Sequence, residues 1–435
     1  MKRGRGTDGE TVTGGRAATV RHVFGERVLS ICMPTNKDHP KGWRWVALSD
    51  VAQMESGHTP SRNHPEYWGG DIPWISVKDA RLAHGKRLSE TEEYTNSLGI
   101  ANSSARLLPA GTVCLSRGGT VGYVVILDRP MATSQGFANW ICGPQLIPEF
   151  LQYLLLAEAD ALEKFSIGTT IKTIYYPDLK AFHVCLPPLA EQKRIVALLD
   201  EAFAGIDEAK AKTEDILERT QALFESHLQS IFSQRGHGWV ERRLGELSRI
   251  NYGYTESASS EKVGPHFLRI TDIQDDGVDW NTVPYCPIDK GDLPKYKLTD
   301  GDIVFARTGA TTGKSYLVSN PPDSVFASYL IRVQLSDKAL IPGFLYLFFQ
   351  TRSYWDVIRA GVSGSAQGGF NASKLGELTI PYPASLNDQK AVIHSIAEIQ
   401  ADTLKAGKLS NRKLQALGEL RESLLTQAFA GELTA

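Results

Sequence analysis

The chain has 435 residues, of which 42% are hydrophobic and 22% are charged, so it is long enough for two or three folded domains. Its formal net charge of −2 excludes a protein that coats nucleic acid with a uniformly basic surface. No apolar run approaches the roughly 18 residues of a membrane-spanning helix. The five cysteines are scattered without a CxxC pair, which excludes a zinc ribbon and is typical of a protein of the reducing cytoplasm.

The first segment, residues 1–42, is basic and rich in Gly, Arg and Thr. It lacks apolar periodicity, and its apolar run Val28–Met33 is too short and too far along the chain for a signal peptide. We therefore expect residues 1–42 to form a disordered extension.

Residues 43–187 alternate short β-type runs with turns. The runs DIPWISV, GTVCLSR, GYVVILD and NWICG are bounded by Gly, Pro, Asn or Asp, and they predict a curved, mostly antiparallel sheet. One other run, Pro148–Phe165, has apolar residues at helical spacing and begins with proline. The segment is therefore predicted to be an α+β domain in which one helix interrupts the strands.

A different pattern fills residues 188–236. Pro187 and Pro188 precede it, and the Gly-rich segment Arg235–Gly238 ends it, so it predicts one helix of roughly 65 Å. Apolar residues recur in steps of three and four, as in a coiled coil. The expected seam consists of Ile195, Leu198, Ala202, Ile206, Ala209, Thr213, Ile216, Thr220, Leu223, His227 and Ile231.

Residues 237–384 repeat the first domain. The segments WRWVALSDVAQMESGHT and WVERRLGELSRINYGYT share Trp, Leu, Gly and Thr at a constant offset of 196 residues. Further along, GTVCLSRGG at 111–119 corresponds to GDIVFARTG at 301–309, and PEFLQYLL at 148–155 to PGFLYLFF at 342–349. Because this period far exceeds the roughly 20–50 residues of a solenoid repeat, it indicates a duplicated domain with pseudo-twofold organisation. A twofold protein suggests a twofold target.

Residues 385–435 predict a second long helix, with Ser385 and Asp388 spaced as in a capping box. A lone long helix cannot bury its apolar seam, so we expect the two helices to form an antiparallel coiled coil. The alternative is that each seam packs only on its own domain. The second seam is expected to consist of Val392, Ile396, Ile399, Thr403, Ala406, Ser410, Leu417, Leu420, Leu424 and Ala428.

Several segments approach catalytic motifs and fail. Gly309–Ser315 has three residues between its glycines where a P-loop needs four. Asn320–Asp323 ends in aspartate where adenine methyltransferases carry an aromatic residue that stacks on the flipped base. The PD…ExK order at Pro177–Lys193 ends in a long helix, and the histidines lack metal-ligand spacing. We predict no catalytic residue, no metal site and no cofactor.

Two pairs of loops suit contact with DNA. Arg117 and Arg307 occupy equivalent places where a strand ends and a Gly-rich turn begins, which would let a guanidinium project towards guanine or phosphate. The alternative is that they pair with local carboxylates or are solvated. Loops 168–174 and 364–370 begin alike and then diverge. The candidate DNA-binding residues are Arg117, Gly118, Gly119, Thr120, Thr169, Thr170, Lys172, Arg307, Thr308, Thr311, Thr312, Lys314, Ser365 and Gln367.

The order of these segments resembles the specificity subunit of type I restriction–modification systems. YWGGDIPWISVKD, GTVCLSRGGTVG, GTTIKTI and LPPLAEQKRIVALLD follow one another, the set recurs, and the chain closes with LRESLLTQAFAGEL. The resemblance covers residues 43–435 and leaves residues 1–42 outside it. The second repeat departs from it in carrying VGPHFLRITD in place of YWGGDIPW, which puts its DNA-facing aromatic residues in doubt.

The resemblance implies two target-recognition domains, 43–187 and 237–384, that read the halves of a bipartite, asymmetric site in double-stranded DNA. The long helices would act as spacers that dock two methyltransferase (modification) subunits. Restriction subunits, which carry nuclease and translocase activity, would join them, and this chain would hold no active site. The remaining alternatives are a coiled-coil DNA-binding or interaction protein unrelated to restriction, and a self-contained DNA methyltransferase.

Overall fold

The computed structural model describes residues 22–23, 26–27, 42–166, 172–274, 277–309, 311–363 and 369–433. Within the expected N-terminal extension, it describes only the antiparallel pair β1 (His22–Val23) and β2 (Glu26–Arg27); the rest of that prediction lies outside the described residues. No helix in the described ranges combines the length and the hydrophobicity that crossing a bilayer requires.

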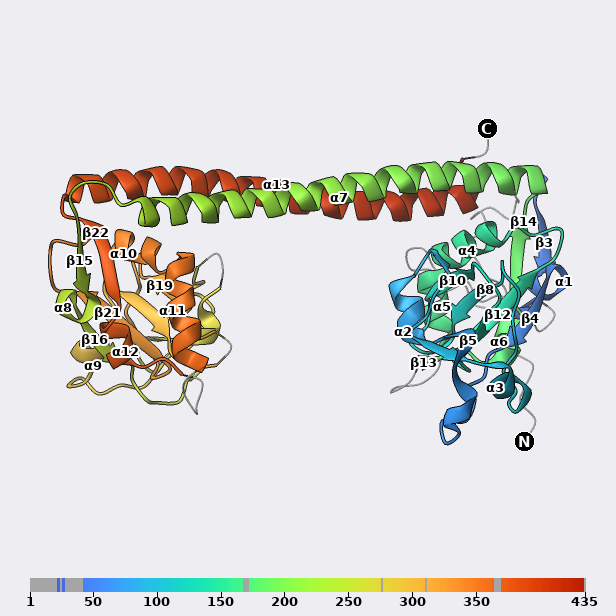
Figure 1. The fold of residues 1–435 in the computed structure, drawn as a ribbon, viewed down its shortest axis with the longest axis horizontal. Coiled ribbons are helices and arrows are strands. Elements are labelled where there is room, and N and C mark those ends of the chain that lie inside the picture. The colour runs from blue at the N-terminus through green and yellow to red at the C-terminus, as the bar shows by residue number, and fades with distance from the viewer. Residues whose placement is uncertain are drawn as a thin grey trace. The chain divides into compact units, whose positions relative to one another are not determined.

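The chain divides into two compact units, Met1–Lys212 with Lys413–Ala435, and Thr213–Arg412. Each unit contains one sequence repeat together with parts of two long helices, α7 (Leu189–Gln234) and α13 (Leu386–Ala430) (Figure 1). The boundary between the units therefore falls inside both long helices.

The first unit is built on a five-stranded sheet. Neighbouring strands are antiparallel except for the parallel pair β10–β6. Strands β8 and β10 are buried along their whole length, which explains why their sequences are nearly continuous apolar runs. The expected, mostly antiparallel sheet is thus confirmed. Its order is β4 (Ala52–Ser56), β12 (Phe137–Cys142), β8 (Val113–Ser116), β10 (Val124–Leu127) and β6 (Arg87–Leu88).

Smaller strand groups accompany this sheet. A three-stranded group is ordered β11 (Ala132–Thr133), β5 (Trp68–Ile75) and β7 (Glu93–Thr95). A separate pair, β3 (Arg44–Ala47) with β14 (His183–Leu186), joins the two ends of the repeat just before α7 begins. The short helices of the unit are α1 (Leu48–Val51), η1 (Pro65–Tyr67), α2 (Val77–Leu82), α3 (Ser97–Ala101) and α6 (Tyr176–Lys180).

The single helix expected over Pro148–Phe165 is two helices, α4 (Pro148–Ala157) and α5 (Ala159–Phe165). The backbone leaves the helical region at Glu158, where ψ is 13°. Because the apolar spacing continues across this one residue, the pattern could not reveal the break.

The second unit repeats the strand order of the first. Its main sheet runs β16, β21, β18, β19, which matches β4, β12, β8, β10, and β15 pairs with β22 as β3 pairs with β14. The strands are β15 (Trp239–Arg243), β16 (Ser248–Tyr252), β17 (His266–Leu268), β18 (Ile303–Ala306), β19 (Ser315–Leu317), β20 (Ser324–Phe326), β21 (Leu330–Leu335) and β22 (Thr379–Pro383). The helices are α8 (Leu244–Leu247), η2 (Ile270–Asp272), α9 (Leu293–Tyr296), α10 (Pro342–Phe348), α11 (Arg352–Ser363) and α12 (Ala372–Gly376).

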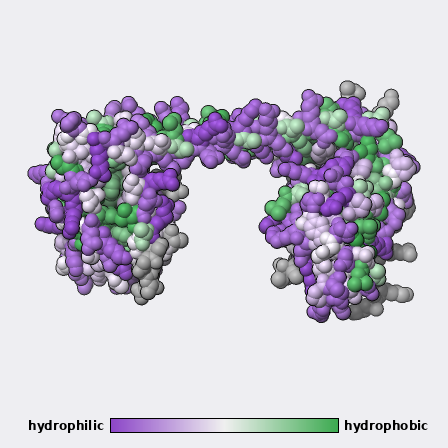
Figure 2. Space-filling model, in the orientation of Figure 1, coloured by the Kyte–Doolittle hydropathy of each residue, from purple (hydrophilic) through white to green (hydrophobic). Residues whose placement is uncertain are grey.

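The two long helices run antiparallel. In the first unit, Arg194 Nη2 donates to the Leu433 carbonyl (2.6 Å) and Arg421 Nη1 donates to Asp207 (2.9 Å). The earlier residue of α7 thus pairs with the later residue of the C-terminal segment, as antiparallel helices require. The fold is therefore the one expected, two mixed α/β repeats joined by long antiparallel helices. Hydrophobic patches are scattered over the otherwise hydrophilic surface of the described residues (Figure 2).

The expected seam is wrong in part. Leu198, Leu223 and Leu420 are 41%, 68% and 48% exposed, and the neighbouring Leu199 and Phe224 are buried instead. The sequence carries adjacent apolar pairs at 198–199 and 223–224, and either member satisfies the helical spacing. Tertiary packing decides which one is buried.

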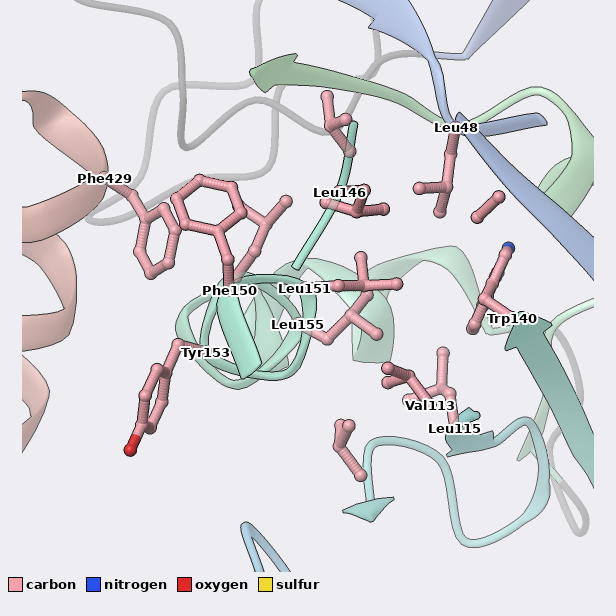
Figure 3. Packing of buried hydrophobic residues seen from close by; sticks show 14 of the residues in the cluster. Leu48, Val113, Leu115, Trp140, Leu146, Phe150, Leu151, Tyr153, Leu155 and Phe429 are labelled. Atoms are coloured by element: carbon pink, nitrogen blue, oxygen red, sulfur yellow. The ribbon is translucent and has the colours of Figure 1, made fainter. Parts of the chain in front are cut away.

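The long helices also pack on the repeats, so their apolar residues serve both the helix pair and the repeat cores. In the first unit, Phe203 of α7 contacts Tyr153 of α4 edge-on, with ring centroids 5.4 Å apart. Phe429 of α13 lies edge-on to Phe150 of α4, with ring centroids 5.3 Å apart (Figure 3). Since these aromatic rings anchor the helices to the repeat, the core of the sheet continues into the helix pair.

Candidate nucleic-acid interface

The structure joins the two predicted DNA-binding loops of the first repeat. Directly after Arg117, strand β9 (Gly118–Gly119) pairs antiparallel with β13 (Lys172–Thr173). Gly119 has φ of 84°, a left-handed conformation that favours glycine, and both it and Thr120 are exposed. The Gly-rich turn and the second loop therefore present one shared surface.

Arg117 lies half-buried beneath this surface. Its Nη1 donates to the Ile174 carbonyl and its Nη2 to the Gln135 carbonyl, both at 3.1 Å. The guanidinium carbon lies 4.0 Å from the centre of the Tyr176 ring. Arg117 is therefore held by the protein rather than solvated, and among the described residues its partners are backbone carbonyls rather than a carboxylate. Backbone carbonyls from two separate segments are its hydrogen-bond acceptors.

Arg307 repeats the frame in the second unit. The Phe370 amide donates to the Arg307 carbonyl (2.9 Å), as the Ile174 amide does to the Arg117 carbonyl (2.8 Å). The Arg307 guanidinium carbon lies 4.9 Å from the centre of the Tyr252 ring. The Nε atoms of both arginines are buried without a hydrogen-bond partner among the residues that the structure describes.

The other candidates of the second turn differ in accessibility. Thr308 is half-buried and Thr311 is exposed. Thr312 is only 8% exposed, and its hydroxyl donates to the Gly309 carbonyl (2.8 Å). The Thr312 hydroxyl thus closes the turn, which disfavours the phosphate contact that the sequence predicted. Lys314 is half-buried, and its amide donates to the Thr311 carbonyl (2.9 Å).

The second loops are described only in part. The exposed Lys172 forms an ion pair with Glu163 of α5, and its ammonium group lowers the pKa of that carboxyl. The charge of Lys172 at the surface is therefore partly neutralised by the Glu163 carboxylate, which weakens the attraction of Lys172 for phosphate. Thr169, Thr170, Ser365 and Gln367 lie outside the described residues.

Aromatic residues beside the arginines were missed by the sequence reasoning. Tyr176 and Tyr252 stack on the guanidinium groups, and Tyr175 and Tyr329 are 52% and 61% exposed. Tyr329 adjoins the site directly, because its carbonyl accepts from the Arg307 amide (3.2 Å). The tyrosine pair that follows GTTIKTI was the available signal for the first repeat. Trp74, in contrast, is 4% exposed and belongs to the core.

A basic hollow of about 1010 Å³ lies between α7 and α11 in the second unit. Lys314 lines it, so the hollow begins at the turn that follows Arg307. Two further arginines, Arg352 and Arg359, come from α11, and Arg352 is exposed. The α7 wall contributes serine and glutamine side chains, which can donate to phosphate without adding charge, and the carboxylate of Glu225. Arg359 is paired with Asp356 (2.6 Å), so the positive charge of the hollow rests mainly on Lys314 and Arg352.

The described residues contain no group of three or more His, Cys, Asp or Glu placed to hold a metal ion. Gly309–Ser315 connects the antiparallel strands β18 and β19, whereas a P-loop leads from a strand into a helix. Asn320 has a φ of 42°, and Asn320–Asp323 lies between strands β19 and β20. Burial raises the pKa of the Cys142 and Cys185 thiols to about 12, so both stay protonated at neutral pH.

Comparisons with known proteins find similar chains in one family. The family model "Type I restriction modification DNA specificity domain" matches twice, at residues 40–219 and 236–417. The specificity subunit of the type I restriction enzyme EcoKI from Escherichia coli is 24% identical over 423 residues, covering 91% of this chain and 90% of that protein. The MjaIX specificity subunit from Methanocaldococcus jannaschii is 30% identical over 231 residues, 49% of this chain and about half (53%) of that protein.

Two solved structures share the fold. A chain from a study of complex assembly and conformational transition in a type I R-M system aligns with a TM-score of 0.74 at 20% identity, covering 91% of this chain and 99% of its own. The HsdS subunit from Thermoanaerobacter tengcongensis aligns with a TM-score of 0.56 at 20% identity, covering 92% and 99%.

Proposed function

Because the chain belongs to the type I restriction–modification DNA specificity family, whose model matches both repeats, we propose that each repeat reads one half of a bipartite, asymmetric site in double-stranded DNA. The observation that carries the proposal is that the two repeats share one backbone arrangement around the arginine but surround it with different side chains. Both repeats place an arginine after the central strand and bond its carbonyl to a second loop. The side chains around that arginine differ, as Gly136 and Tyr329 do at equivalent places.

The paired loops supply what base readout needs. Exposed glycine backbone lets a loop approach DNA closely, and an arginine held beneath it presents fixed N–H donors. Each repeat is close to neutral, with 12 Lys and Arg against 14 Asp and Glu in 43–188 and 15 against 16 in 239–385. Much of the attraction for phosphate must then come from bound partners.

The long helices have features suited to docking two equivalent partners, which we take to be the modification subunits. Restriction subunits would then join this assembly. Leu223 and Leu420 are exposed leucines 197 residues apart, the same offset that separates Gln192 near the start of α7 from Gln389 near the start of α13. Equivalent places on antiparallel helices offer the same apolar contact twice. The chain then acts as the non-catalytic, address-reading part of the assembly.

Methylation mapping tests the proposal. We expect a genome-wide map of methylated adenines to contain one bipartite motif that disappears when this gene is deleted and returns when it is restored. The chain should copurify with two methyltransferase subunits, and the isolated chain should transfer no methyl group. An unchanged methylation map after deletion would refute the DNA-reading role, and methyl transfer by the isolated chain would establish an enzyme instead.

A further inference from the structure

An aromatic ring lies against the arginine of each repeat, but it comes from a different place in the sequence. In the first repeat the ring is that of Tyr176, the first residue of helix α6. In the second it is that of Tyr252, the last residue of strand β16. The two repeats therefore fill the same space beside the guanidinium by different routes.

The positions correspond across the repeat. Ser56 ends β4 as Tyr252 ends β16, and Ala372 begins α12 as Tyr176 begins α6. Each repeat thus has one tyrosine and one small residue at these two positions, in opposite order. A ring at either position reaches the arginine, so the ring itself is the feature that both repeats share.

Each tyrosine is anchored through its hydroxyl. Tyr176 Oη donates to the Phe137 carbonyl (3.2 Å), which lies on the strand next to Arg117. Tyr252 Oη accepts from the Ala372 amide (3.1 Å). Ala372 is the first residue of α12, the position that Tyr176 occupies in the first repeat. Because both ends of the ring are fixed, its face is a rigid support for the guanidinium.

The stacked guanidinium keeps a defined set of donors. In Arg117, one N–H on each terminal nitrogen is used by a carbonyl and the Nε–H is buried, which leaves one N–H on Nη1 and one on Nη2. Arginine loses much side-chain entropy when it is ordered, and a support that orders it beforehand removes that cost from binding.

We propose that Tyr176 and Tyr252 are positioning residues for DNA recognition: each holds the guanidinium of its arginine, Arg117 or Arg307, in the orientation that reads one half-site. This inference rests on the proposed function of the repeats. It also predicts that a tyrosine ring at position 56 can replace the ring of Tyr176 in the first repeat, and that a ring at position 372 can replace the ring of Tyr252 in the second.

The test uses the chain in complex with its methyltransferase subunits and measures methylation of DNA libraries in which one half-site is varied. Tyr176→Ala should reduce base discrimination at one half-site about 10-fold, as Arg117→Ala should, and leave the other half-site unchanged. Tyr176→Phe, which keeps the ring, should lose less. Tyr123→Ala is the matched control, because Tyr123 is also half-buried in the first repeat but makes an edge-to-face contact with His84.

Moving the ring separates positioning from simple stability. Adding Ser56→Tyr to Tyr176→Ala should restore discrimination in the first repeat, and adding Ala372→Tyr to Tyr252→Ala should restore it in the second. Equal discrimination by Tyr176→Ala and wild type overturns the proposal. So does a transferred ring that restores the thermal midpoint but not the discrimination. Failure of the proposed function is distinct, because the wild-type complex would then show no half-site preference to lose.

Discussion

Replacing the buried Gln192 should lower the free energy of unfolding several times more than replacing an ordinary surface residue. It is fully buried near the start of α7 and makes three hydrogen bonds of 2.9 Å. Its Oε1 accepts from the Ile147 amide at the start of α4, and its Nε2 donates to the Gln145 and Pro187 carbonyls. The side chain thereby ties the long helix to the repeat.

The second repeat contains the same arrangement. Gln389 accepts from the Ile341 amide (2.9 Å) and donates to the Ala339 (2.7 Å) and Pro383 (2.8 Å) carbonyls. A leucine at either glutamine would leave one amide and two carbonyls without these partners, of which the proline carbonyl is buried and the other two groups are partly buried. At a net value of about 1 kcal/mol for each hydrogen bond, Gln192→Leu should cost about 3 kcal/mol. That is roughly a 100-fold change in the local opening equilibrium.

Hydrogen exchange measured by mass spectrometry suits this test, because it reports on each unit separately. Amides of α4 and of the β3–β14 pair should exchange roughly 100-fold faster in Gln192→Leu, and amides of the second unit should not change. The control is Gln152→Leu, since Gln152 is also buried but makes a single bond of 3.3 Å to the Lys86 carbonyl. If the two variants exchange alike, the three bonds of Gln192 do not carry the stability assigned to them.

Gln192→Glu adds a pH dependence. The new carboxyl would be buried and would face the Gln145 and Pro187 carbonyls, so its folded pKa should lie above the unfolded value of about 4.3. A raised acid pKa means that the folded state favours the protonated form. The penalty should therefore be small below the unfolded pKa and should grow as pH rises through the folded pKa. Equal stability of this variant at pH 4 and pH 8 would contradict the buried geometry.

The remaining predictions concern recognition and assembly. Arg307→Ala should relax or abolish recognition of one half-site while the complex still assembles; unchanged methylation of that half-site would show that the contact is misassigned. Arg352→Ala should weaken binding to all DNA sequences alike and lower the slope of log K against log salt by about 0.9 if it contacts one phosphate. A loss confined to one sequence would contradict this. Leu223→Asp or Leu420→Asp should reduce the bound methyltransferase subunits from two to one, measured by native mass spectrometry, and an unchanged stoichiometry would remove these leucines from the interface. Deleting one heptad from both long helices should change the number of bases between the half-sites of the recognised motif but not the half-sites themselves, which methylation mapping would reveal. An unchanged spacing would refute the role of the helices in setting the distance between the half-sites.

Local patterns in the sequence predicted the main elements and their order, although they did not show the break between α4 and α5. Buried strands such as Val113–Ser116 and Val124–Leu127 carry apolar runs that need both faces covered. The duplicated segments revealed two copies of one domain, since equivalent residues recur at nearly constant offsets. Helix Leu189–Gln234 follows two prolines and has sustained helical periodicity, both of which are visible in the sequence. The strand and helix patterns depend on neighbouring residues alone, and the duplication is visible when the sequence is compared with itself.

Tertiary structure alone decided which candidates lie together and what they contact. Leu198 and Leu199 fit the helical spacing equally well, and only packing against the repeat buries the second. The partners of Arg117 lie 18 and 57 residues further along the chain, and they are backbone carbonyls, which every residue has and no motif marks. Its supporting ring comes from a position that differs between the repeats. Hydrogen bonds and stacking depend on distance in space, and the fold brings distant segments within reach.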